Sequence, residues 1–224
     1  MIEKLVSCPL FRGIESSDIQ MLIKCCGAKK VLYHKDQIIF HQHDVPRDLM
    51  ILIDGSIVVC NDTVSGKRNI IATFEKSGEL FGEVFVFLEK NAYDNYAQAQ
   101  ENSHVLHLPK SFFYSPCEKA CDCHSKIISN MLLILAQKAY FLNQKVRILS
   151  YTTLRQKIAS LFLNNCDENG IVKLEMNREK LADFLNVARP SLSRELMKMQ
   201  SEGLIKVDKR QIIIQDFESM QNIL

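Results

Sequence analysis

The sequence predicts an α+β fold in which an antiparallel β-rich part is followed by one long helix and a small helical domain with a hairpin. Three observations predict it. Short apolar runs separated by turn residues fill residues 31–108, and a seven-residue apolar pattern continues through 123–149. Two closely spaced helices and a hairpin follow in the last third of the chain. We therefore expect three domains, at 1–122, 123–149 and 150–224.

The composition is that of a globular protein. The chain has 224 residues, of which 47% are hydrophobic and 24% are charged, and this excludes wholesale disorder. The net charge is only +2, so a nucleic-acid contact needs a local basic face. The start, Met1-Ile2-Glu3-Lys4, lacks the apolar core of a signal peptide, and the apolar stretch 131–136 is too short to cross a bilayer. We expect a cytoplasmic protein with no membrane partner.

The first part of the chain changes from helix to strand. Ser16-Ser17-Asp18 offers an N-cap for a helix over 19–26. Beyond Val31, turn residues such as Asp54-Gly55 and Ser77-Gly78 separate short apolar runs that are typical of strands. These runs are 37–40, 49–53, 56–60, 69–74 and 104–108. Short strands at near-regular spacing predict an antiparallel sandwich or barrel.

One apolar seam runs along the segment 123–149. Its members recur in steps of four and three, a period that keeps one face of a helix against a partner helix. The seam residues are Ile128, Leu132, Leu135, Ala139, Leu142, Val146 and Leu149. We favour a homodimer axis over a long helix buried within one subunit. A second row is expected to pack on the sheet domain: Ile127, Met131, Ile134 and Phe141.

The C-terminal domain contains two helices joined by a three-residue turn. A helix over 152–164 and a short strand over 171–174 precede them. Asn177 is expected to cap the first of the pair, 178–185, and the turn Asn186-Val187-Ala188 leads into the second. That second helix starts near Arg189-Pro190 and ends before Gly203. A hairpin follows, with strands at 204–207 and 211–214 and with 208–210 at its tip. This order predicts a winged helix-turn-helix.

The second helix of the pair carries the residue types that read DNA. Arginine can bind guanine O6 and N7 through two hydrogen bonds, and serine can donate or accept at a base edge. Residues 178–210 hold eight Lys/Arg against five Asp/Glu, a local basic excess. The expected DNA contacts are Arg189, Pro190, Ser191, Ser193, Arg194, Lys198, Lys209 and Arg210. The alternative is an ordinary helical hairpin with a solvated face.

Two further stretches carry a family resemblance. Gly78-Glu79-Leu80-Phe81-Gly82-Glu83, after Asp54-Gly55-Ser56-Ile57, looks like the phosphate cassette of a cyclic-nucleotide-binding β-roll. With the long helix and 189–196, the whole chain resembles the CRP/FNR family of bacterial regulators. The resemblance implies a jelly-roll-like double-stranded β-roll as sensor, a dimer and a palindromic operator. The implied partners are double-stranded DNA, a second copy of the chain, a small-molecule effector of unknown identity and RNA polymerase.

The expected effector pocket departs from that of the cAMP-binding relatives. The resemblance implies a cassette in which those relatives share a glutamate and, after it, an Arg-Ser pair that binds the cyclic phosphate. Gly82 and Glu83 match the start of the cassette, but Tyr93 and Asp94 stand at the Arg-Ser positions. A tyrosine in place of the cation and a carboxylate beside it remove the attraction for a phosphate. We therefore expect no tight binding of cAMP.

Cysteines form a second candidate sensor. Cys117, Cys121, Cys123 and His124 lie within eight residues at the entry to the long helix. Thiolate and imidazole ligands suit zinc or an iron–sulfur cluster, and neighbouring thiols suit redox sensing. The alternative is a reduced loop at 117–124, with four other cysteines as small core residues. These four are Cys8, Cys25, Cys60 and Cys166.

Other function classes find less support in the residues. Five histidines could suggest haem: His34, His41, His43, His104 and His107. Solvated strand faces explain the pairs His41/His43 and His104/His107 more simply. The chain has no G-x-S-x-G, P-loop, H-E-x-x-H or Gly-rich dinucleotide turn, so we expect no enzyme. A signalling adaptor without DNA stays as the alternative, and the exposed arginines of 189–194 argue against it.

Overall fold

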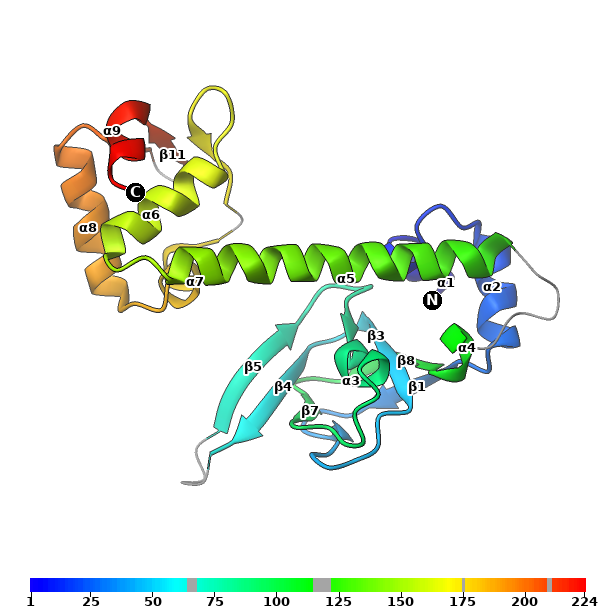
Figure 1. Ribbon diagram of the computed structural model, residues 1–224. Coiled ribbons are helices and arrows are strands. Elements are labelled where there is room, and N and C mark those ends of the chain that lie inside the picture. Colours follow the sequence, from blue (N-terminus) through cyan, green and yellow to red (C-terminus); the bar gives the residue numbers. More distant parts are fainter. Residues whose placement is uncertain (64–67, 115–121, 175, 209–210) are drawn as a thin grey trace. The chain divides into compact units, whose positions relative to one another are not determined.

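The computed structural model describes residues 1–63, 68–114, 122–174, 176–208 and 211–224. The chain divides into two compact units, Met1–Leu135 and Ala136–Leu224. The boundary falls inside one continuous helix, α5 (Asp122–Leu149), so each unit contains part of that helix (Figure 1). Across the described residues, none of the helices combines the length and the apolar character needed to span a membrane.

The first unit is built mainly from strands, with short helices around them. Its helices are α1 (Ile2–Val6), the 3-10 helix η1 (Pro9–Phe11), α2 (Ser16–Cys25), α3 (Glu83–Phe87), α4 (Ser111–Tyr114) and the start of α5. Its strands are β1 (Lys29–Tyr33), β2 (Ile38–Phe40), β3 (Asp48–Asp54), β4 (Ile57–Asp62), β5 (Arg68–Phe74), β6 (Leu80–Phe81), β7 (Tyr96–Ala99) and β8 (Ser103–Pro109). The expected N-cap of α2 is wrong: the helix already begins at Ser16, after Glu15, and no side chain caps it.

The strands form two antiparallel four-stranded sheets within the described residues. Their orders are β1-β8-β3-β6 and β2-β7-β4-β5, which confirms the antiparallel β-roll (Figure 1). Strand β3 explains why the run 49–53 contains no polar residue. Leu49, Ile51 and Ile53 point into one core, and the alternate residues Met50 and Leu52 point into another. Both faces of this strand are buried, so an alternating polar pattern is excluded.

The first half of α5 completes one of these cores. Ile127, Met131 and Ile134 are buried together with residues of α1, α2, β3 and β8. This confirms three members of the second apolar row. The prediction is wrong for the fourth member, Phe141, which belongs to the second unit and is 52% exposed. Its ring contacts Phe184 of the same unit, with ring centroids 5.9 Å apart. Phe141 follows Ile134 by seven residues, about two turns of the helix, and it packs within the second unit.

The second unit contains the rest of α5 and a compact set of helices around a small sheet. Its further elements are α6 (Leu154–Asn164), β9 (Ile171–Val172), α7 (Arg178–Phe184), α8 (Arg189–Ser201), β10 (Ile205–Asp208), β11 (Gln211–Ile214) and α9 (Phe217–Asn222). Thr153 starts α6 with a capping box that includes Gln156. The antiparallel sheet has the order β10-β11-β9, and β9 is two residues shorter than the expected strand 171–174.

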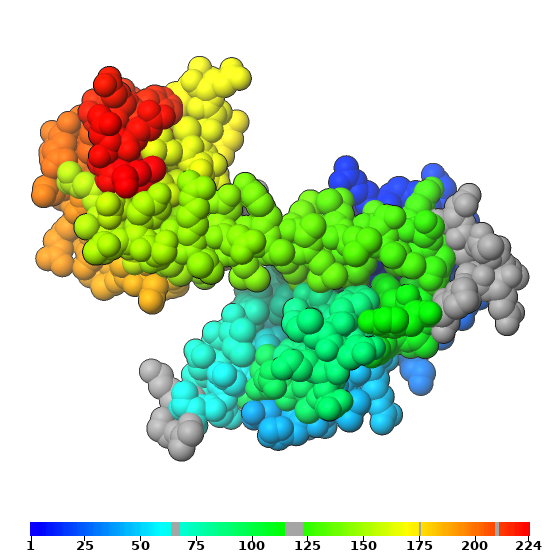
Figure 2. Space-filling view, viewed as in Figure 1, coloured from blue at the N-terminus to red at the C-terminus, as the bar shows by residue number. Residues whose placement is uncertain are grey.

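The surface of α5 is not fully covered in either unit, and its side chains form part of both surfaces (Figure 2). On the predicted seam, Leu132 is 64% exposed in the first unit and Val146 is 66% exposed in the second. Ala139 is also exposed, while Leu135 and Leu149 are half-buried. A stripe of large apolar side chains on a long helix is a surface suited to a partner.

Candidate nucleic-acid interface and effector pocket

The paired helices of the second unit begin where the sequence predicts, and α7 ends one residue earlier than expected, at Phe184. The side-chain Oδ1 of Asn177 accepts a hydrogen bond from the Lys180 amide at 2.8 Å, which satisfies one open donor at the start of α7. Asn186 adopts a left-handed conformation with φ of 54°, and it reverses the chain after α7. Helix α8 then begins at Arg189, directly before the proline that a first turn tolerates.

Helix α8 has one buried and one exposed face. Leu192, Leu196 and Met199 are buried in the core of the second unit. The expected DNA-reading side chains lie on the remaining surface. Arg189, Pro190, Arg194 and Lys198 are exposed, and Ser191 and Ser193 are half-buried. The described members of the set therefore lie on one helix, at its solvent side.

Arg194 occupies the centre of this exposed face. Its Nη2 atom lies 3.5 Å from the hydroxyl oxygen of Ser191, one turn earlier on the helix. The contact is long and exposed, so the guanidinium stays available to an external acceptor. Such a group can form two parallel hydrogen bonds with guanine.

An arginine that the sequence reasoning missed holds α8 in place. Arg155 on α6 donates from Nε to Glu195 at 2.6 Å, and from Nη1 and Nη2 to Glu202 at 2.7 and 3.1 Å. The hydrogen bonds from Arg155 lower the pKa of Glu202, and those with Glu202 and then Glu195 raise the pKa of Arg155. The paired residues are 40 or more positions apart in the sequence, so no local sequence pattern predicts the pairing. It fixes the orientation of the helix that carries Arg194.

The hairpin after α8 provides the wing. Asp208 pairs with Gln211 at the end of the β10–β11 ladder. The amide of Val207 donates to the side chain of Gln200 at 3.2 Å, which ties the wing to the end of α8. Lys209 and Arg210, the basic residues expected at the tip, lie outside the described residues.

The cassette of the first unit is a turn followed by a short helix. Gly82 has φ of 78°, and a Cβ at this position would lie 2.6 Å from the Cε atom of Met50. The left-handed backbone favours glycine here, whereas the Met50 methyl is the end of a flexible side chain and can shift. Glu83 follows at the start of α3 and is 4% exposed. Both residues therefore belong to a closely packed turn.

Tyr93 lies in the core between the two sheets. It is 4% exposed, and its ring stacks on Phe40 at 3.9 Å with an angle of 16° between the planes. The ring of Phe85 meets it edge-on at 5.0 Å. Burial, together with the carboxylates of Asp48 and Asp44, raises the pKa of Tyr93 far above its ordinary value. The side chain is thus a neutral hydrophobic filler in this core.

Asp94 points away from that core. It is exposed, and its carboxylate lies 4.0 Å from the amino group of Lys90. The two residues at the expected Arg-Ser positions are therefore separated, one in the interior and one in solvent. The structure brings Gly82 near Tyr93, whose hydroxyl would lie 3.7 Å from a Cβ at Gly82, and it places Asp94 outside this group.

The cysteine group is described only in part. Cys117 and Cys121 lie outside the described residues. Cys123 is half-buried at the start of α5, and the ring of His124 packs edge-on against Phe112 at 5.0 Å. Within the described ranges, no three His, Cys, Asp or Glu residues come together as a metal site would require. The metal or redox role of 117–124 stays a prediction.

The remaining cysteines do not share one environment. Cys8 and Cys60 are buried, and burial raises the pKa of the Cys8 thiol to about 11, which keeps it protonated. Cys166 is half-buried. The expectation of a core position is wrong for Cys25, which is exposed near the end of α2.

The histidines are divided between loop and strand. His41 and His43 are exposed in the loop after β2 rather than on a strand face. On β8, His104 lies 2.6 Å from Asp54, and His107 lies 3.0 Å from the hydroxyl of Tyr33. The β8 histidines are half-buried and paired, so the expectation of solvated strand faces holds for none of these four.

Comparison with known proteins assigns both units to described families. The family "Cyclic nucleotide-binding domain" matches residues 30–120, and the family "Crp-like helix-turn-helix domain" matches residues 156–223. Together these matches cover the two four-stranded sheets and the winged helix-turn-helix. The chain belongs to the CRP/FNR family.

Relatives of this CRP/FNR chain match it from end to end. It is 20% identical to the cyclic AMP receptor protein of Thermus thermophilus over 96% of each chain. It is 22% identical to electron transport regulator A of Shewanella oneidensis, over 92% of this chain and 82% of the relative. The crystal structure of the Thermus thermophilus catabolite activator protein shares the fold, with a TM-score of 0.53, 19% identity and coverage of 96% and 97%.

Family membership gives the two units their general roles. As in its CRP/FNR relatives, the winged helix-turn-helix is the DNA-binding element, and the chain is a transcription regulator. The cyclic-nucleotide-binding-like sheets form the other unit. Sequence reasoning found the DNA-binding element because caps, turn and apolar periodicity are local signals. Arg155 could not be found in this way, because its ion pairs join residues 40 or more positions apart and leave no local signal.

Proposed function

We propose that the protein is a homodimeric regulator that binds a palindromic operator and responds to an effector other than cAMP. The observation that carries this proposal is the exposed face of α8, with Arg189 and Arg194 at its start and middle. In helix-turn-helix proteins the first residues of this helix meet base edges in the major groove. We assign 1–122 to sensing, 123–149 to dimerisation and 150–224 to DNA binding.

The dimer is inferred from the exposed seam of α5. Ile128 is 38% exposed and Leu142 is 58% exposed, in addition to Leu132 and Val146. Residues at this spacing form a continuous stripe on a helix, and pairing two stripes removes both from water. A twofold dimer presents two copies of α8, so the operator should contain two inverted half-sites about one helical turn apart.

Within each half-site we assign separate roles to the side chains. Arg194 is expected to bind guanine through two hydrogen bonds, and Ser193 to contact an adjacent base edge. Arg189 and Lys198 lie at the borders of the exposed face and are expected to bind phosphates. Ser191, Pro190, Lys209 and Arg210 complete the proposed interface; the last two are placed by sequence position at the wing tip.

The effector is proposed not to be cAMP. Tyr93 occupies the core where a phosphate-binding arginine is needed, and Asp94 adds a negative charge beside the cassette. The names of the relatives point in different directions, to cyclic AMP in one case and to electron transport in another. The group Cys117, Cys121, Cys123 and His124 remains our proposed alternative sensor, for zinc, an iron–sulfur cluster or thiol oxidation.

Isothermal titration calorimetry tests the prediction about cAMP. Titrating cAMP into the purified chain is expected to give no binding heat up to about 1 mM ligand, a concentration that would reveal any micromolar site. A micromolar dissociation constant would contradict the prediction. Elemental analysis and a visible spectrum of anaerobically purified protein serve as the companion measurement, because they detect iron, zinc or haem.

Selection of binding sites tests the proposed function as a whole. The full-length chain is incubated with random duplexes, and bound sequences are recovered and read. We expect enrichment of a two-fold symmetric site, bound with an affinity that falls steeply as salt rises. Enrichment of no duplex at any salt would favour the adaptor function instead. A regulator of this type acts where the DNA lies, so we place it in the cytoplasm, with RNA polymerase as a proposed partner and no catalytic role.

A further inference from the structure

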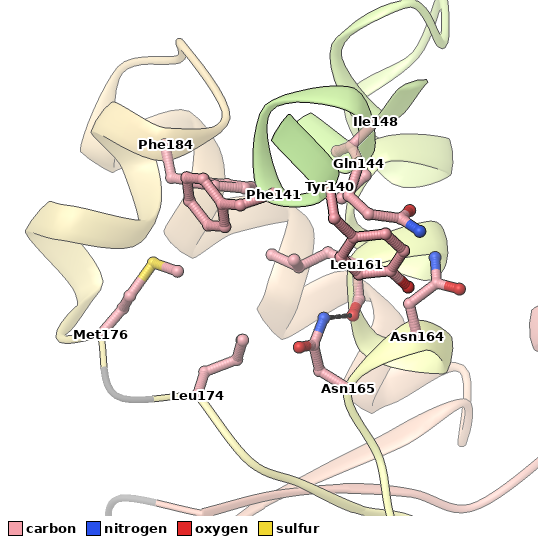
Figure 3. A pocket seen from close by; sticks show the side chains of 10 residues that line it. All are labelled: Tyr140, Phe141, Gln144, Ile148, Leu161, Asn164, Asn165, Leu174, Met176 and Phe184. Atoms are coloured by element: carbon pink, nitrogen blue, oxygen red, sulfur yellow. Dashed lines mark hydrogen bonds between the residues drawn. The ribbon is translucent and has the colours of Figure 1, made fainter. Parts of the chain in front are cut away.

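The second unit encloses a cavity of about 180 Å³ that neither the DNA-binding surface nor the dimer seam uses. It lies between the second half of α5, helix α6 and helix α7 (Figure 3). Phe141 and Phe184 form an aromatic wall, and Leu161 and Leu174 contribute aliphatic surface. An apolar cavity of about 150 Å³ is large enough for a benzene ring. The space therefore suits a molecule with a single aromatic ring.

One polar group in the wall lacks a partner. Gln144 lines this cavity, and its Oε1 atom is buried and has no hydrogen-bond donor among the described residues. The amide of Asn165, on another side of the cavity, already uses its Nδ2 atom to donate to the Leu161 carbonyl at 2.8 Å (Figure 3). A buried acceptor without a donor is costly, and a ligand that carries a donor relieves that cost.

The cavity and the dimer seam use opposite faces of α5. The cavity residues Phe141, Gln144 and Ile148 each follow a seam residue, Ala139, Leu142 and Val146, by two positions. Two positions on an α-helix correspond to a rotation of about 200°. A second chain that packs along the seam therefore leaves the cavity accessible, so ligand binding and dimerisation do not compete.

The cavity joins the dimer helix to the DNA-binding element. Phe184 is the last residue of α7, the first helix of the helix-turn-helix. It contacts α5 twice, through the ring of Phe141 and through the amino group of Lys145, which lies 5.3 Å from its ring centroid. A molecule seated beside Phe184 would change how firmly α7 packs on α5, and hence the presentation of α8.

We propose that this cavity binds a small aromatic molecule bearing one hydrogen-bond donor, and that occupancy modulates operator binding. The site deepens the proposed function, and its regulatory part rests on that function. It also offers an effector position that is independent of the sensor cassette, whose core Tyr93 fills. Gln144 is the residue that selects a donor-bearing ring over a plain hydrocarbon.

Phenol and toluene are matched probes for this proposal, because they differ mainly by one hydroxyl donor. NMR-detected titration of the full-length chain is expected to give a phenol dissociation constant of about 1 mM or below. Gln144→Met should weaken phenol relative to toluene by about three- to tenfold. Gln137→Met, the same change at an exposed position of α5, should leave both affinities unchanged. Equal affinities in wild type and Gln144→Met would overturn the role of Gln144.

A cavity-filling variant gives a second test that does not depend on Gln144. Leu174→Trp places a large ring at the half-buried edge of the cavity, and it should abolish the binding of both probes. Phenol that still binds this variant, or that fails to bind the wild type, would refute the site. Saturating phenol should change the affinity of the wild type for its selected operator by at least about threefold. An operator affinity that phenol leaves unchanged would refute the regulatory part alone. A chain that binds no duplex would refute the proposed function. In that case the phenol titration still tests the cavity as a binding site.

Discussion

Leu142→Glu is expected to convert the protein into a monomer and to reduce operator affinity by about 100-fold or more. Leu142 is 58% exposed in the single chain, so its replacement removes no core contact and the fold should persist. In the proposed dimer, the same position faces its counterpart across the seam. Two carboxylates would then be buried opposite each other, which opposes association strongly. Light scattering coupled to size-exclusion chromatography measures the mass, and a mobility-shift titration measures the affinity.

Gln137→Glu is the matched control for that variant. It introduces the same carboxylate on the same helix, at an exposed residue five positions before Leu142 and on the opposite face. The control should remain dimeric and should bind the operator almost as tightly as the wild type. A Leu142→Glu chain that stays dimeric at micromolar concentration would show that the seam is not the dimer axis.

Arg194→Ala is expected to weaken binding to the selected operator by about 1–3 kcal/mol, a factor of roughly 5 to 150, while the mass of the dimer stays unchanged. The side chain is exposed and makes only a 3.5 Å contact with Ser191, so its removal costs little stability. The loss should appear for the selected site and not for random duplex, because a base contact carries sequence information and a phosphate contact does not. Competition titrations against both duplexes measure the difference.

Arg12→Ala is a suitable comparison, because it removes an exposed arginine of the other unit. It should lower neither specific nor non-specific affinity appreciably. Lys198→Ala, by contrast, should weaken all duplexes alike and reduce the salt dependence by about one phosphate contact. An Arg194→Ala footprint identical to that of the wild type would remove this residue from base recognition.

The DNA-binding element was predictable because its signals are local. Asn177, the turn at 186–188 and the proline at the start of α8 each act within one turn of their own position, and the structure confirms all three. Strand β3 was predictable for a related reason, since a strand buried on both faces must be apolar throughout. The β-roll and the long helix followed from patterns of the same short range.

The departures lie where a residue's role depends on distant parts of the chain. Phe141 continues the apolar row of 127–134 in sequence, but it belongs to the second unit, where its ring packs on Phe184. Cysteine is often buried, which led to a predicted core position for Cys25, but the residue is exposed. Arg155 gives no sequence signal, and only the approach of α6 to α8 brings it to Glu195 and Glu202.

The amino-acid sequence by itself determined the order of the elements, the exposed seam of α5 and the arginine-bearing face of α8. Each of these follows from periodicity and capping, which operate over a few residues. Only the tertiary structure decided that Tyr93 is buried and stacks on Phe40, that Arg155 holds α8, and that Gln144, whose Oε1 atom has no donor among the described residues, lines a cavity. The physical reason is that packing and hydrogen-bond satisfaction depend on which distant groups share a space, and spacing along the chain does not specify that.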